Sequence, residues 1–115
     1  MERRRDERAR VSMNIRWGDD AYCLWQDRIT SLSVGGCFVQ TGREKNAGEK
    51  IYLRLWLGDG EKIVRGEVRY RLERVGLGVQ FFELMERDKG HLAELVEHYR
   101  DATQADPAGG AGQTS

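Results

Sequence analysis

Two arginines near the start of the chain have a spacing that suits an anionic ligand. Arg4 and Arg8 stand four positions apart, as Arg-x-x-x-Arg, within the opening residues MERRRDERAR. A guanidinium is a planar fork of N–H donors that binds phosphate through two bonds and also fits the O6/N7 edge of guanine. The pair therefore predicts a site for a guanine nucleotide and its phosphates, with Arg5 and Arg10 as substitute members.

A second candidate element is the polar turn inside ITSLSVGGCFV, residues 29–39. Ser31 and Ser33 are followed by Gly35 and Gly36, so hydroxyls and bare backbone lie together. Exposed N–H groups and hydroxyls at a turn can donate to an anion, and glycine lets another group approach the backbone closely. The alternative is structural: the serines satisfy their own backbone, and the glycines only shape the turn.

The overall composition limits the classes of partner. The chain has 115 residues, enough for one domain, and its 19 basic and 19 acidic side chains cancel. A neutral body argues against bulk affinity for DNA or membranes, and we expect no exposed aromatic platform for nucleic acid. The first ten residues carry five arginines against three acids, which makes them a local basic arm.

The expected location is the cytoplasm. No apolar run approaches the about 20 residues that cross a bilayer, and no apolar segment of a secretory signal follows the N-terminal charges. Cys23 and Cys37 should be out of register on neighbouring strands, too far apart for a disulfide. We therefore expect both cysteines to be reduced thiols.

Alternation of apolar and polar residues predicts six strands. Val64, Val68, Tyr70 and Leu72 are expected to share one face of the fifth strand. The expected strand ranges are 11–17, 21–31, 37–41, 51–57, 64–72 and 77–81, with a hairpin turn at 58–60.

A change of period after residue 85 predicts a helix. Leu92, Leu95, Val96 and Tyr99 fall on one helical face, with Asp88 as the N-cap and an end near Arg100. The fold class is thus all-β with a C-terminal helix, in which six antiparallel strands form a small barrel. The expected organisation is a basic arm at 1–10, the barrel and helix at 11–103, and a Gly-rich disordered tail at 104–115.

Motifs of enzymes and metal sites are missing from the sequence. It contains no phosphate-binding Gly-x-x-x-x-Gly-Lys loop, no His-Glu-x-x-His and no Gly-x-Ser-x-Gly. His91 and His98 share a helical face, but solvated helix histidines are commoner than ligand pairs. We therefore expect a binding protein with no metal and no cofactor.

Together, these elements resemble the PilZ domain, a family of bacterial receptors for the second messenger cyclic di-GMP. RRDER supplies Arg4 and Arg8 of its Arg-x-x-x-Arg motif, and SLSVGG supplies Ser31, Ser33 and Gly36 of its Asp/Asn-x-Ser-x-x-Gly motif. The last strand, GLGVQF at 76–81, followed by a helix, is similar as well. The resemblance implies a six-stranded barrel that binds cyclic di-GMP.

The resemblance also implies a role for each site residue. Arg4 and Arg8 would clamp phosphates and guanine edges, Ser33 would donate to the ligand, and Gly36, with Gly35 as an additional candidate, would allow close approach. Ser31 departs from the family, because a short neutral hydroxyl stands where Asp or Asn usually holds the guanine. Ligand binding would fold the arm down and present a new surface to an unidentified protein partner. The alternative is a degenerate relative that binds no nucleotide and serves as a protein-interaction adaptor.

Overall fold

The chain forms six strands and one helix. The structure, a computed structural model, describes residues 8–105. Its elements in chain order are β1 (Ala9–Gly18), β2 (Trp25–Leu32), β3 (Gly36–Gln40), β4 (Lys50–Leu57), β5 (Gly60–Leu72), β6 (Gly76–Phe82) and α1 (Glu86–Ala105). The expected strands are confirmed in number and type. Ala9 and Arg10, which we had expected in the arm, belong to β1.

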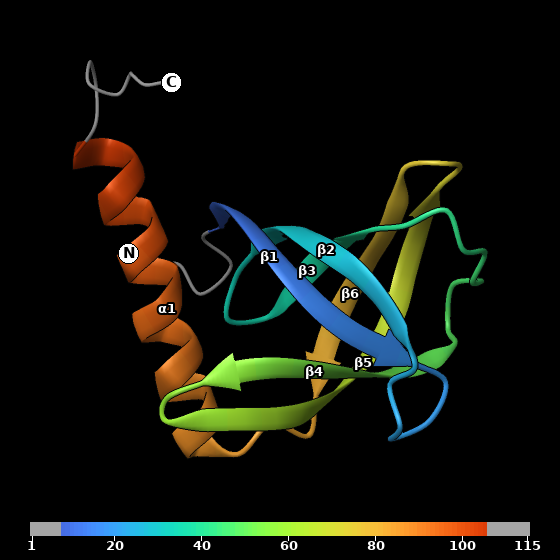
Figure 1. Cartoon of the computed structure of the whole chain (residues 1–115), viewed down its shortest axis with the longest axis horizontal. Helices are drawn as coiled ribbons and strands as arrows, with labels where there is room; N and C mark the ends of the chain where they lie inside the picture. Colours follow the sequence, from blue (N-terminus) through green and yellow to red (C-terminus); the bar gives the residue numbers. More distant parts are fainter. Residues whose placement is uncertain (1–7, 106–115) are drawn as a thin grey trace.

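The six strands close into an antiparallel barrel in the order β1-β2-β3-β6-β5-β4 (Figure 1). Closure occurs where β1 pairs with β4, through Arg16–Arg54, Trp17–Leu53 and Gly18–Tyr52. A closed barrel leaves no strand edge free to pair with another chain. The predicted fold class is therefore confirmed.

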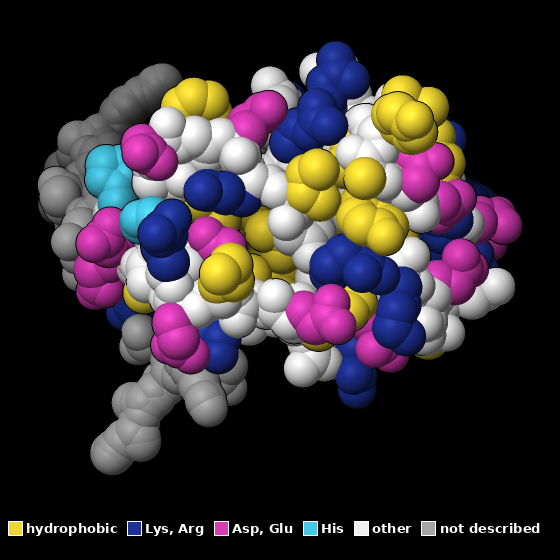
Figure 2. Space-filling view, turned by 90° about the horizontal axis from the view of Figure 1, so that it is seen from below, with side chains coloured by type: hydrophobic (Ala, Val, Ile, Leu, Met, Phe, Trp, Pro, Cys, Tyr) yellow, Lys and Arg dark blue, Asp and Glu magenta, His cyan; other side chains and the backbone are white. Residues whose placement is uncertain are grey.

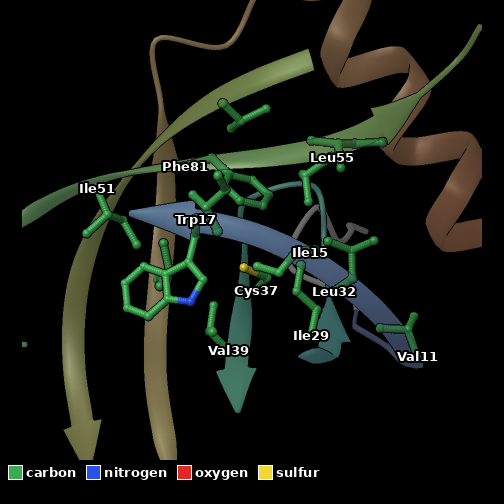
Figure 3. Packing of buried hydrophobic residues seen from close by; sticks show 14 of the residues in the cluster. Val11, Ile15, Trp17, Ile29, Leu32, Cys37, Val39, Ile51, Leu55 and Phe81 are labelled. Carbon is green, nitrogen blue, oxygen red and sulfur yellow. The ribbon is translucent and has the colours of Figure 1, made fainter. Parts of the chain in front are cut away.

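Alternating side chains fill the barrel (Figure 3). Along β1, Val11, Ile15 and Trp17 point inward and are at most 6% exposed, while their sequence neighbours face outward. The indole N–H of the fully buried Trp17 donates a 2.9 Å hydrogen bond to the carboxylate of Asp27. The one polar atom of this large side chain is thus satisfied, so its burial carries no unpaired donor.

Helix α1 packs its apolar face against β1 and β4 at one end of the barrel (Figure 1). Leu92 and Val96 are buried in the core, and Leu95 and Tyr99 pack against it, as expected. The expected N-cap is wrong: the helix begins at Glu86, so Asp88 lies in its first turn, where a negative charge suits the helix dipole. The helix also continues to Ala105, beyond the expected end near Arg100.

The second strand begins later than expected, at Trp25 instead of residue 21. A tight turn occupies the intervening residues, where the N–H of Tyr22 bonds to the Asp20 carboxylate and the N–H of Cys23 bonds to the Asp20 carbonyl. Cys23 has a φ of 50° there, which is not a strand conformation. Cys23 and Cys37 are both buried free thiols.

A β-bulge changes the direction of side chains in β5. Val68 pairs with Val79 and Tyr70 pairs with Gly78, so the register shifts by one residue at Arg69. The shift moves the residues that follow to the opposite face of the sheet. The expectation that Tyr70 and Leu72 face the core is therefore wrong, and both are 48% exposed.

Candidate functional site

Arg8 and Ser31 meet at the start of β1. The Nη1 of Arg8 donates a hydrogen bond of 3.0 Å to the Oγ of Ser31, although the residues are 23 positions apart. The β1–β2 register, in which Arg10 opposes Ser31 and Ala9 opposes Leu32, brings them together. The contact is exposed, so it can exchange with a ligand at small cost.

Ser33 holds the turn between β2 and β3. Its hydroxyl accepts hydrogen bonds from the N–H groups of Gly35 (3.2 Å) and Gly36 (3.1 Å) and lies 3.3 Å from the Gly36 carbonyl, to which it donates. The backbone N–H of Ser33 donates to the same carbonyl at 2.8 Å. Ser33 is only 3% exposed. The geometry thus supports the structural alternative for this serine, and its donation to a ligand stays a prediction.

The two glycines of the turn have different surroundings. Neither has a positive φ, so left-handed backbone is not the reason for glycine at this turn. A Cβ on Gly36 would lie 2.1 Å from the carbonyl oxygen of Val79, so only glycine lets β3 approach β6 here. A Cβ on the exposed Gly35 would meet only the Ser33 hydroxyl, at 3.9 Å. Gly36 is therefore required by strand pairing, whereas Gly35 leaves open backbone at the surface.

A cavity of about 280 Å³ lies beside this turn. Strand β6 forms its floor, and the Ser33–Gly36 turn, the start of β1 and the outer end of β5 form its walls. Its lining residues are Arg8, Ser33, Gly35, Gly36, Arg69, Tyr70, Gly78, Val79 and Gln80. This set holds two arginines and no carboxylate, so the cavity is locally positive on a neutral protein and suits an anion.

Tyr70 covers bare backbone at the edge of this cavity. A Cβ on Gly78 would lie 2.2 Å from two atoms of the Tyr70 ring, so the ring occupies the place of a side chain at residue 78. Phe38, whose ring centroid is 6.3 Å from that of Tyr70, covers Gly76 in the same way. Gly76 and Gly78 therefore serve packing of the sheet, as expected, and an aromatic face is exposed where none was expected.

A second, larger cavity of about 640 Å³ adjoins the first. Gly35 and Gln80 line both cavities, so they form one continuous depression. The larger part lies between the β2–β3 turn, the end of β6 and the start of α1, and Glu83 and Lys89 are its charged residues. Both arginines belong to the smaller part, which is where a phosphate would be held.

The buried thiol of Cys37 lies beneath the turn. Burial raises the pKa of Cys37 to about 12, and the positive charge of Arg8 opposes the rise. The effect of Arg8 on a buried neighbour places its guanidinium above the turn. Cys37 itself stays a neutral thiol at physiological pH and contributes packing, not chemistry.

The structure brings some predicted site residues together and leaves others apart. Arg4 and Arg5 lie outside the described residues. Arg10 is exposed on β1, opposite Ser31, but does not line the cavity. The predicted residues that do line it are Arg8, Ser33, Gly35 and Gly36, and Ser31 joins through Arg8.

Sequence reasoning missed the contribution of β5 and β6: Arg69, Tyr70, Gly78 and Gln80. A usable signal existed in the β5–β6 hairpin, whose register pairs Leu72 with Gly76 and Tyr70 with Gly78. An aromatic residue opposite a glycine is a known way to cover bare sheet backbone. The Arg69 guanidinium donates a 2.8 Å hydrogen bond to the amide oxygen of Gln80, which fixes both side chains along one wall.

Comparison with known proteins identifies the family. The sequence model of the PilZ domain matches residues 2–98. The chain belongs to the PilZ domain family. No curated protein sequence matches it. PilZ domains are binding and adaptor domains, not enzymes, and within residues 8–105 no group of three His, Cys, Asp or Glu side chains could hold a metal ion.

Two solved structures share the fold of this PilZ domain. The PilZ domain of CeSA from a cellulose-synthesizing bacterium superimposes with a TM-score of 0.62 at 16% identity, over 80% of this chain and 96% of that one. The Bacillus subtilis inhibitor of motility gives a TM-score of 0.68 at 16% identity, over 95% of this chain but 55% of that longer chain. At this identity the likeness establishes the barrel and helix. In the described part of the chain, no helix is long and apolar enough to span a bilayer.

Proposed function

We propose that this PilZ domain is a bacterial, cytoplasmic receptor for cyclic di-GMP. The observation that carries the proposal is the meeting of Arg8 with the Ser31–Gly36 segment at the rim of a positively charged cavity. These are the positions of the two family motifs, and the barrel register places them side by side. A dianionic ligand with two guanine bases matches guanidinium groups that bind phosphate and the O6/N7 edge of guanine.

Each site residue has a role in this proposal. Arg8 releases Ser31 and binds a phosphate or a guanine edge, and Arg4, from the arm outside the described residues, supplies the second guanidinium. Ser31 offers a hydroxyl where a carboxylate or amide is usual. Open backbone at Gly35 borders both parts of the depression, so a ligand larger than either part can lie across it. Binding draws the arm against the barrel and changes the surface offered to a protein partner.

A second function, that of an adaptor without a nucleotide, is favoured by two observations. Ser31 cannot form the charge-assisted bonds that a carboxylate makes to guanine N–H donors. Ser33 is nearly fully buried, and its hydroxyl bonds within its own turn. In this case Arg8 and Ser31 would stay paired, and the surface around them would meet a protein directly.

A nucleic-acid function has less support. On the face in Figure 2, basic side chains are interspersed with acidic ones and do not form one basic field. Sequence-independent binding to nucleic acid depends on such a field.

Titration calorimetry of the purified protein with cyclic di-GMP distinguishes the two leading proposals. GTP and cyclic AMP serve as controls, because they share the guanine base or the cyclic phosphate but not the whole ligand. Selective binding at micromolar concentration or below is expected for a receptor. No heat up to high micromolar ligand would contradict the receptor and favour the adaptor, whose partner would then be sought by pull-down.

A further inference from the structure

The Tyr70 side chain has more exposed surface than its packing role needs. Its ring covers Gly78, yet 48% of the residue stays accessible, and it lines the small cavity. A leucine would cover Gly78 as well, without offering a flat aromatic face. The β-bulge at Arg69 is what turns this ring outward, away from the core where period-two alternation would put it.

The neighbours of Tyr70 suit a flat, electron-rich base. Phe38 lies behind the ring, with centroids 6.3 Å apart, and limits its movement on the sheet. Arg8 and Arg69 line the same cavity, and Gln80 holds the Arg69 guanidinium in place at 2.8 Å. Aromatic rings bind bases by stacking, while arginines bind the edge of a base or its phosphate.

We infer that Tyr70 is the stacking platform for one purine base of the ligand, with Arg8 and Arg69 at the rim. This inference rests on the proposed function and adds how the base is held. It also accounts for the departure at Ser31: where the usual contact to the guanine edge is weakened, stacking on Tyr70 supplies affinity through the face of the base. Stacking tolerates any base, so selection of guanine falls to the arginines.

The test compares cyclic di-GMP binding by the parent protein and by three variants. Tyr70→Leu keeps Gly78 covered but removes the aromatic face, and we expect affinity to fall roughly 5- to 150-fold. Tyr70→Phe keeps the face and should bind within about twofold of the parent. Tyr22→Leu is the matched control, because Tyr22 is 74% exposed and does not line the cavity.

A second measurement does not depend on the variants. On ligand addition, the ring protons of Tyr70 should shift upfield in the NMR spectrum, because a stacked purine exerts a ring current on them. The ring protons of Tyr22 should not shift. This readout decides the matter if Tyr70→Leu lowers the thermal stability.

The outcomes separate the inference from the proposed function. If the parent binds cyclic di-GMP while Tyr70→Leu binds equally well, or the Tyr70 protons do not shift, the stacking role is overturned and the receptor stands. If the parent itself does not bind, the receptor proposal fails first, and the stacking role falls with it.

Discussion

The guanidinium of Arg8 donates a 3.0 Å hydrogen bond to the hydroxyl of Ser31, across 23 positions of sequence. The bond joins the last residue before β1 to a residue of β2, at the rim of a cavity whose charged side chains are both arginines. With Ser31 in place of a carboxylate, the arginine is held by a neutral acceptor that a phosphate can replace readily. The pair is therefore poised to open for an anionic ligand.

Arg8→Ala should weaken binding of cyclic di-GMP roughly 5- to 150-fold, the effect of losing one good contact to a base or phosphate. Arg16→Ala is the matched control, because Arg16 is also an exposed arginine at β1 but does not line the cavity. Titration calorimetry on both variants measures the difference. Equal affinities for Arg8→Ala and the parent would show that the site lies elsewhere.

Ser31→Asp should tighten binding of cyclic di-GMP by about 5-fold or more, because a carboxylate makes charge-assisted bonds to the guanine N–H donors. The introduced carboxylate would also pair with Arg8, which sets a limit to the gain. Ser31→Ala, which removes the hydroxyl without adding charge, is the control. Unchanged or weaker binding by Ser31→Asp would count against the place we assign to Ser31 in the site.

Gly36→Ala should lower the free energy of unfolding by roughly 3 kcal/mol, because the new methyl group would overlap the Val79 carbonyl and force β3 and β6 apart. Gly35→Ala should stay within about 1 kcal/mol of the parent, since the new methyl group meets no close atom. Urea unfolding of the two variants tests this pair. Similar stabilities would mean that β3 can shift away from β6 without cost.

The thiol of Cys37 should make the protein less stable at alkaline pH. Its pKa is raised from 9.0 to about 12 in the folded state, so the stabilisation is complete below pH 9.0 and is lost as the pH rises toward 12. Over that window this thiol alone lowers the free energy of unfolding by about 1.4 kcal/mol per pH unit. Urea unfolding at several pH values should give a shallower slope for Cys37→Ala. Parallel slopes would be inconsistent with a buried, protonated thiol.

The fold was accessible from the sequence because barrel strands have a local signature. Period-two alternation in β1 and β4 marks the buried faces, and the change of period marks the helix that carries Leu92 and Val96. These patterns reflect which side chains leave water, and burial acts on each strand whatever its partner. The motif residues Arg8, Ser33 and Gly36 were found for a related reason, since their types and order can be read along the chain.

Tertiary structure alone decided what each motif residue touches. Ser33 turns its hydroxyl into its own turn, and Gly36 is needed by the Val79 carbonyl of the distant strand β6. The bulge at Arg69 reverses Tyr70 and places its ring in the cavity. Register and bulges depend on the pairing of distant strands, and a shift of one residue moves a side chain to the other face. The sequence by itself therefore determined the barrel and the motif, whereas the closed sheet decided which side chains form the site.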